Sequence, residues 1–166
     1  MNYIPLNIKT EYDLMNSLIK IDDLLLYAES RDVKALGITD SSMFGTMEFI
    51  TKCNLCGIKT IVGCELIIED AYVVLYARNY DGLVSLFKLV SKKNIDGVIT
   101  FEDVEKYISN LIVVTSIRHY EVVSKYFNDC YLKFHNEKTK EEALKLTKNI
   151  VYMDLIRYFD YFFFCF

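Results

Sequence analysis

Short apolar runs alternate along the chain with longer segments in which apolar residues recur at helical spacing. Runs rich in β-branched and aromatic residues predict buried strands, whereas a spacing of three or four residues predicts amphipathic helices. Seven segments are predicted to be strands: residues 3–8, 33–39, 60–68, 71–77, 111–115, 130–134 and 150–153. Because helical segments separate most of these strands and the connections are short, the pattern predicts an α/β fold with a parallel sheet or barrel.

Capping residues and one glycine mark the ends of several predicted helices. Thr100 and Thr139 are each followed three residues later by an acidic residue, a capping-box spacing that predicts helix starts. Gly57 follows a helical pattern at residues 43–56 and predicts the end of that helix. A further helix is predicted at residues 120–127.

The composition is typical of a globular domain with a large core. The chain has 166 residues, 52% of them hydrophobic, with one proline and six glycines, which excludes a disordered chain. Its 19 basic and 23 acidic residues give a net charge of −4, whereas a chain that binds nucleic acid by itself usually has a basic excess. No apolar run approaches the roughly 20 residues that cross a bilayer, so we expect a soluble cytoplasmic protein.

The last residues differ from the rest of the chain in composition. Residues 1–158 are predicted to form one domain, and residues 159–166 (FDYFFFCF) form an aromatic tail with Asp160 as its single charge. Two interpretations are open: the tail docks into a hydrophobic seam of the domain, or it is a truncated end whose natural covering has been lost.

The five cysteines are predicted to be free thiols. Their number is odd and their spacing is not that of a disulfide framework. Cys53 and Cys56 form a C-x-x-C motif, but no second pair follows to complete a structural zinc site. This favours buried helix cysteines over metal ligands.

A series of segments follows the order of one known domain, at residues 3–12, 35–40, 43–49 and 57–65, then at 75–79 and 82–91 and, more faintly, at 149–158. In this order they resemble the N-terminal PHP (polymerase and histidinol phosphatase) domain of the bacterial DNA polymerase III alpha subunit. The resemblance covers nearly the whole chain. It implies a PHP-type distorted barrel of about seven parallel strands ringed by helices.

Family members with phosphoesterase activity hold divalent metals at the carboxyl ends of the barrel strands, where a metal-bound hydroxide attacks a phosphate ester. The resemblance places the remnants of that metal site at Pro5, Asn7, Lys9, Asp40, Ser41, Glu65, Tyr72, Leu155 and Arg157. Of these residues, Asp40 and Glu65 keep a ligand chemistry. The ammonium of Lys9 and the guanidinium of Arg157 present no lone pair to a cation at neutral pH. The two histidines, His119 and His135, lie outside the motifs. The metal site is therefore predicted to be lost, and no cofactor is expected.

The substitutions suggest that protein cations have taken over the charge of the metals. In this hypothesis Lys9 and Arg157 form a partly buried cluster with Asp40 and Glu65, in which removal of one partner leaves an unpaired charge. The alternative is that all four groups point into solvent and contribute little to stability.

Three functions are open for this chain. The first, which the resemblance implies, is a non-catalytic structural module that packs against the remainder of a polymerase alpha subunit, serves as a docking surface for a proofreading exonuclease and contacts DNA only indirectly. Any DNA-directed DNA polymerase activity would then belong to other parts of a longer chain. The second is an active metal-dependent phosphoesterase or 3′-5′ exonuclease in which Asp40 and Glu65 hold Mn²⁺, Zn²⁺ or Mg²⁺. The third is a stand-alone protein that binds a phosphorylated ligand with Lys9 and Arg157.

Overall fold

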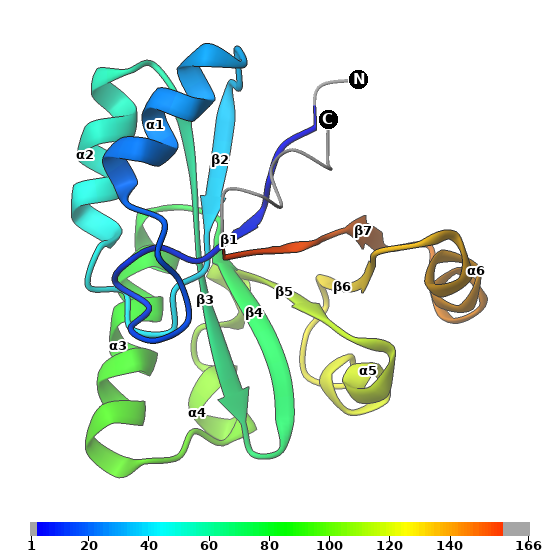
Figure 1. Cartoon of the computed structure of the whole chain (residues 1–166). Helices are drawn as coiled ribbons and strands as arrows, with labels where there is room; N and C mark the ends of the chain where they lie inside the picture. Colours follow the sequence, from blue (N-terminus) through cyan, green and yellow to red (C-terminus); the bar gives the residue numbers. More distant parts are fainter. Residues whose placement is uncertain (1–2, 158–166) are drawn as a thin grey trace. The chain divides into compact units, whose positions relative to one another are not determined.

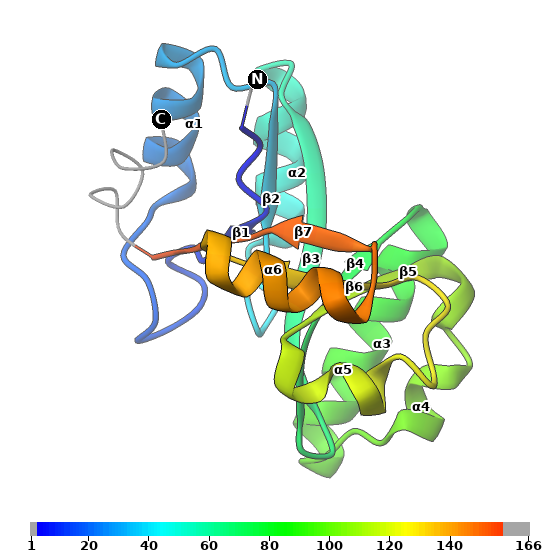
Figure 2. The ribbon, with the colours of Figure 1, turned by 90° about the vertical axis from the view of Figure 1, so that its right-hand side faces the viewer.

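The computed structural model describes residues 3–157 of the chain, and these form two compact units (Figures 1 and 2). The first unit takes in residues up to Val62 and again from Asp154, and the second takes in Gly63–Met153. The sequence predicted one domain over residues 1–158. The aromatic tail, with Cys165, lies outside the described residues.

Four parallel strands and two helices build the first unit. Its elements are β1 (Asn7–Ile8), α1 (Ile21–Ser30), β2 (Ala35–Ile38), α2 (Thr46–Leu55), the first part of β3 (Lys59–Ile68) and β8 (Leu155–Ile156). The strands follow the order β3-β2-β1-β8, and Ile8 of β1 is in register with Ile38 of β2 and Ile156 of β8. The carboxyl ends of β1, β2 and β8 therefore lie at one edge of this sheet.

Amphipathic helices close the core of the first unit. Leu24 of α1 and Phe49 of α2 are fully buried with Ile8 and Ile156 in one apolar cluster, as the helical spacing of these residues requires. Gly37 of β2 is a glycine for a steric reason, because a Cβ atom there would lie 2.6 Å from the carbonyl oxygen of Leu6. The strand ends that carry the candidate site thus rest on a closely packed layer.

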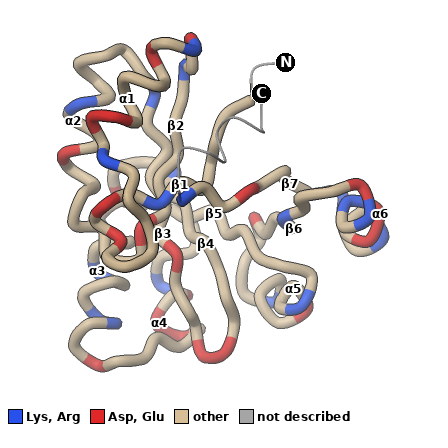
Figure 3. The backbone as a smooth tube through the Cα atoms, in the orientation of Figure 1, with Lys and Arg blue, Asp and Glu red and all other residues tan. Residues whose placement is uncertain are grey.

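The second unit is a five-stranded mixed sheet with helices. Its elements are the rest of β3, then β4 (Ala71–Ala77), α3 (Tyr80–Asp96), α4 (Phe101–Glu105), a 3-10 turn (Ile108–Asn110), β5 (Leu111–Thr115), α5 (Ile117–Val123), β6 (Cys130–Phe134), α6 (Glu137–Leu146) and β7 (Ile150–Tyr152). The strand order is β7-β6-β5-β4-β3, and α6 packs against β6 and β7 (Figure 2). The lysines of α6 alternate with glutamates and form no continuous basic stretch (Figure 3).

The predicted α/β class is confirmed, and the details differ at a few places. The structure describes eight strands where about seven were expected, because Leu155 and Ile156 form the additional short strand β8. Strand β4 is antiparallel to both neighbours, since the two residues Glu69 and Asp70 that join it to β3 can close only a hairpin.

Helix and cysteine predictions also have mixed outcomes. The helix predicted at residues 120–127 begins three residues earlier, as α5, and α6 is capped by Asn136, with Thr139 as the reciprocal partner of the capping box. The predicted cap at Thr100 is confirmed for α4.

Cys53, Cys56, Cys64 and Cys130 are free thiols, as expected. Among the described residues, no helix has the length and apolar character to span a membrane.

Candidate functional site

Residues that follow β1, β2 and β8 form a buried polar cluster at the carboxyl ends of these strands. Backbone hydrogen bonds set the strand ends side by side: the Lys9 amide donates to the Ile156 carbonyl, and the Thr39 amide donates to the Ile8 carbonyl, both at 2.9 Å. The cluster therefore lies where the sequence predicted the remnant metal site.

Lys9 is an internal cation. Its residue is only 2% exposed, and its Nζ lies 3.0 Å from Oδ2 of Asp13 and donates to the Thr39 carbonyl at 2.5 Å. A buried ammonium needs such partners, since moving an isolated charge from water into a protein interior costs several kcal/mol. The prediction that all four charged groups point into solvent is thus wrong for Lys9.

Asp13 is the anion of this pair, and sequence reasoning missed its role. Asp13 is 3% exposed and accepts hydrogen bonds from the Ser41 hydroxyl at 2.9 Å and from the Asn16 amide nitrogen at 3.1 Å. Burial raises the pKa of the Asp13 carboxyl, but the hydrogen bonds of Asn16, Lys9 and Ser41 and the charge of Lys9 outweigh it and hold the pKa below its usual value. The signal in the sequence is the i, i+4 spacing of Lys9 and Asp13.

Asp40 is also buried, but it binds a different partner. It is 1% exposed, and its two carboxylate oxygens accept from the backbone amide of Thr10 at 2.7 Å and from the Thr10 hydroxyl at 2.5 Å. Burial raises the pKa of Asp40, and the two hydrogen bonds from Thr10 only partly oppose this rise. The structure therefore pairs Lys9 with Asp13, and it ties Asp40 to Thr10 in the loop after β1.

The neighbouring predicted positions take part in packing and hydrogen bonding. Pro5 is buried and accepts from the Gly37 amide at 2.8 Å, and the side-chain oxygen of Asn7 accepts from the Thr39 hydroxyl at 2.5 Å. Ser41 donates to Asp13, and Leu155 is an apolar residue at the edge of β8. None of these four side chains offers a free carboxylate or imidazole.

Arg157 ends the described part of the chain. Its carbonyl accepts from the Ser17 hydroxyl at 2.9 Å, and the same hydroxyl donates to the Lys9 carbonyl at 2.6 Å. The Nε atom of Arg157 is buried and has no hydrogen-bond partner among the described residues. Arg157 is thus attached to the cluster through its backbone.

Glu65 and Tyr72 belong to the second unit. Glu65 is half-buried in β3, in register with Val74, and Tyr72 is exposed on β4, in register with Ile67. His119 is half-buried on α5, and His135 is exposed after β6. All four residues belong to the second unit, whereas Lys9, Asp13 and Asp40 belong to the first.

The donor set of the cluster does not fit a divalent metal. Among residues 3–157, no three or more His, Cys, Asp or Glu side chains are grouped to hold an ion. Both oxygens of Asp40 already accept from Thr10, the carboxylate of Asp13 accepts from three side chains, and Lys9 can only donate. The arrangement satisfies its charges internally.

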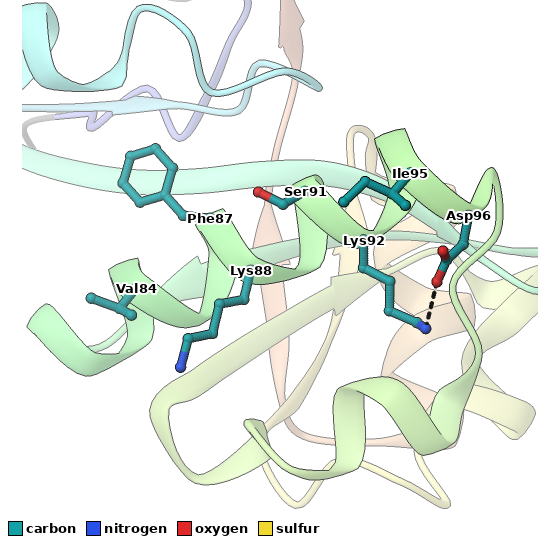
Figure 4. Close-up of a pocket in the computed structure, with 7 residues that line it drawn as sticks. All are labelled: Val84, Phe87, Lys88, Ser91, Lys92, Ile95 and Asp96. Carbon is teal, nitrogen blue, oxygen red and sulfur yellow. Dashed lines mark hydrogen bonds and ion pairs between the residues drawn. The ribbon is translucent and has the colours of Figure 1, made fainter.

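The surface also offers a stripe on α3 in the second unit. A shallow pocket of about 460 Å³ runs along successive turns of this helix, past Val84, Phe87 and Ile95 (Figure 4). Lys92 lies on its flank, where it pairs with Asp96 at 2.8 Å and with Asp103 at 3.4 Å. The stripe is apolar along its centre, and this cation is neutralised by its neighbours.

Comparison with known proteins identifies relatives in sequence. The chain is 36% identical over 116 residues to a DNA polymerase III subunit alpha of Staphylococcus aureus (strain Mu50), an alignment that covers 66% of this chain and 11% of that protein. The corresponding protein of strain COL is 32% identical over 139 residues, with 76% and 13% covered, and that of Ureaplasma parvum is 37% identical over 87 residues, with 52% and 9% covered. The chain thus spans only about a tenth of the length of these relatives.

Solved structures share the fold at low sequence identity. An amidohydrolase from Chromobacterium violaceum, solved with bound sulfate and no metal, superposes with a TM-score of 0.65 at 9% identity over 95% of this chain and 88% of that one. A candidate metal-dependent phosphoesterase from Bifidobacterium adolescentis gives 0.66 at 10% identity, with 93% and 87% covered. The family model of the PHP domain matches residues 5–156. The chain therefore belongs to the PHP domain family.

Proposed function

We propose that this chain is a non-catalytic structural and docking domain of a bacterial replicative DNA polymerase, a PHP domain of the DNA polymerase III alpha type whose metal site is degenerate. The similarity to alpha subunits and the small share of their length that the chain spans support a place within a larger polymerase. Polymerase activity would reside elsewhere in such a protein. The partners would be the remainder of the alpha subunit and a proofreading exonuclease.

The observation that carries the proposal is the buried Lys9–Asp13 ion pair. Hydrolysis of a phosphate ester by the chemistry of this family requires a metal-bound hydroxide, and the metal requires lone pairs from carboxylates and imidazoles. At the carboxyl end of β1, the chain instead places an ammonium with its own buried counter-ion. A cation fixed in the protein supplies positive charge to the cluster without supplying a site for hydroxide.

Metal analysis tests this proposal directly. The purified chain is incubated with Mn²⁺, Zn²⁺ and Mg²⁺, desalted and analysed for bound metal beside an apo control. The expected result is no stoichiometric metal and no hydrolysis of phosphomonoesters or phosphodiesters. Stoichiometric metal with hydrolysis that is lost in Asp40→Ala and Glu65→Ala would overturn the proposal in favour of an active phosphoesterase or exonuclease.

Phosphate binding without hydrolysis is a second candidate function, and the environment of Arg157 supports it. The buried Nε atom of Arg157 has no hydrogen-bond partner among the described residues, and guanidinium groups bind phosphate well. Lys9 already bonds to Asp13 and Thr39, so a phosphate would have to rely on Arg157. Saturable phosphate binding that Arg157→Met abolishes, without turnover, would replace the structural role by that of a stand-alone phosphate-ligand binder.

A further inference from the structure

A groove between α1 and α2 exposes leucine side chains on the surface of the first unit. It has a volume of about 300 Å³, and Leu25, which is almost fully buried, forms its floor. Leu26 of α1 and Leu55 of α2 line the groove and are 65% and 83% exposed. Apolar side chains gathered in a groove of a folded domain are a common feature of protein interaction sites.

The charges around this groove are unevenly distributed. The basic residue among those that line it is Lys52, which forms ion pairs with Asp22 and, at 2.8 Å, with Glu48. Further along the groove lie Glu29 and Cys56, whose thiol hydrogen-bonds to the Glu29 carboxylate. Among the residues that line the groove, Glu29 therefore has no cation beside it, whereas Asp22 is paired with Lys52.

We propose that the α1–α2 groove docks an amphipathic helical segment of a protein partner, with apolar residues against Leu26 and Leu55 and a lysine or arginine at Glu29. Two helices that flank an apolar floor form the type of groove into which a third helix inserts residues spaced at i, i+3 or i+4. The ten residues of α1 extend about 15 Å, which matches two to three turns of such a segment. The charge of Glu29 selects a basic partner.

This inference deepens the docking role proposed above, because it names one surface and the chemistry of its occupant. It does not depend on the loss of the metal site. The stripe on α3 does not indicate the charge of a partner, because Lys92 beside it is already paired with Asp96 and Asp103. That stripe does supply a control residue, since Ile95 is 81% exposed, close to the value for Leu55.

Two synthetic amphipathic peptides of about three helical turns serve as probes, with the same leucine pattern and with either lysines or glutamates on the flanks. Affinity is measured by fluorescence anisotropy with the full chain. We expect the lysine peptide to bind about tenfold more tightly than the glutamate peptide, a difference of about 1.4 kcal/mol. Leu55→Ala should weaken binding several-fold, whereas Ile95→Ala should leave it unchanged. Glu29→Lys should reverse the preference between the two peptides.

The alkylation rate of Cys56 measures independently whether a peptide occupies the groove. Cys56 is exposed in the groove, whereas Cys53, Cys64 and Cys130 are buried, and Cys165→Ser removes the remaining thiol. Saturating lysine peptide should slow alkylation of Cys56.

Three results would overturn the inference: equal affinity for both peptides, equal effects of Leu55→Ala and Ile95→Ala, or an unchanged alkylation rate. A dimer in sedimentation that Leu55→Ala converts to a monomer would assign the groove to a second copy of the chain instead. The proposed function is tested by metal content, so its failure would be distinguished from a failure of this inference.

Discussion

The two units of this molecule handle polar groups in opposite ways. Among the described residues, ten polar or charged side chains are buried, and eight of them lie in the first unit. That unit contains all three of the buried charges, which are Lys9, Asp13 and Asp40. The second unit buries only Ser85 and Thr115 from this group, and its core is otherwise apolar.

This contrast concerns the cost of burying charge. A protein core that is selected only for stability buries apolar side chains, because each buried charge must be compensated by a partner. The first unit buries charged groups at the strand ends where the PHP resemblance locates metal ligands, and it pairs Lys9 with Asp13 and hydrogen-bonds Asp40 to Thr10. The second unit carries Glu65 and Tyr72 at the corresponding positions, half-buried and exposed, and places no buried charge beside them within that unit.

The largest effect should come from removing the internal cation. Lys9→Met leaves the Asp13 carboxylate buried without its counter-ion, and we expect a loss of about 3 to 5 kcal/mol in the free energy of unfolding. For a chain of this size, that loss lowers the melting temperature by about 6 to 20 °C. Thermal and urea unfolding measure the change, and treatment with EDTA should leave the melting temperature of the unaltered chain as it is.

A matched control comes from the second unit. Lys88→Met removes a solvent-exposed lysine from α3 whose ammonium lies 5.8 Å from the centre of the Tyr107 ring, and it should change the stability by no more than about 1 kcal/mol. If Lys9→Met were as silent as Lys88→Met while EDTA destabilised the chain, the ion pair would not have replaced a metal.

The two buried aspartates should respond to pH with opposite signs. The pKa of Asp13 is lowered in the folded state, so its contribution to stability is present above the ordinary value of 3.8 and is lost as the pH falls through the folded pKa. The pKa of Asp40 is raised, so its contribution is fully present below 3.8 and is lost as the pH rises through its folded pKa. The stabilising contribution of Asp13 is therefore lost toward acidic pH, and that of Asp40 is lost toward neutral pH.

Asparagine variants separate the two contributions. Asp13→Asn should destabilise the chain at neutral pH, and its difference from the unaltered chain should shrink as the pH falls below 3.8. Asp40→Asn should lie within about 1 kcal/mol of the unaltered chain at neutral pH, because an amide can still exchange hydrogen bonds with Thr10. Its disadvantage should grow as the solution is acidified. Urea unfolding across this range gives both curves, and parallel curves for the two variants would contradict the assignment.

The sequence predicted the fold better than it predicted the site. Apolar periodicity identified α2 and the strands β2 to β7, because helical spacing and β-branched runs are local signals. It did not show that β4 runs antiparallel, and it assigned no strand to Leu155 and Ile156, because the pairing of so short a segment depends on contacts with β1 rather than on its own residues.

The sequence named Lys9 and Asp40 as candidate site residues, but it did not predict which groups pair with them. Resemblance pointed to Lys9 and Asp40 at the ends of β1 and β2, and the structure buries both residues there. The identity of the counter-ion depends on how the loop after β1 turns back, with the Asp13 amide donating to the Thr10 carbonyl at 2.9 Å. A loop of this kind is set by tertiary contacts, so the pattern of residues alone could not choose Asp13 over Asp40 or Glu65.

A last pair of variants compares neutral hydrogen bonds in the two units. Ser17→Ala removes a buried hydroxyl that bonds to the carbonyls of Lys9 and Arg157, and Thr115→Val removes one that donates to the Tyr72 carbonyl at 3.0 Å. We expect losses of about 1 to 2 kcal/mol for Ser17→Ala and about 0.5 to 1.5 kcal/mol for Thr115→Val, because the Ser17 hydroxyl shares its one proton between two carbonyls and also accepts from the Ile19 amide at 3.1 Å, so its loss disturbs more hydrogen bonds. Urea unfolding at neutral pH measures both. If Ser17→Ala cost as much as Lys9→Met, the hydroxyl network rather than the ion pair would hold the first unit together, and the contrast between the units would lie in neutral hydrogen bonds instead of charge.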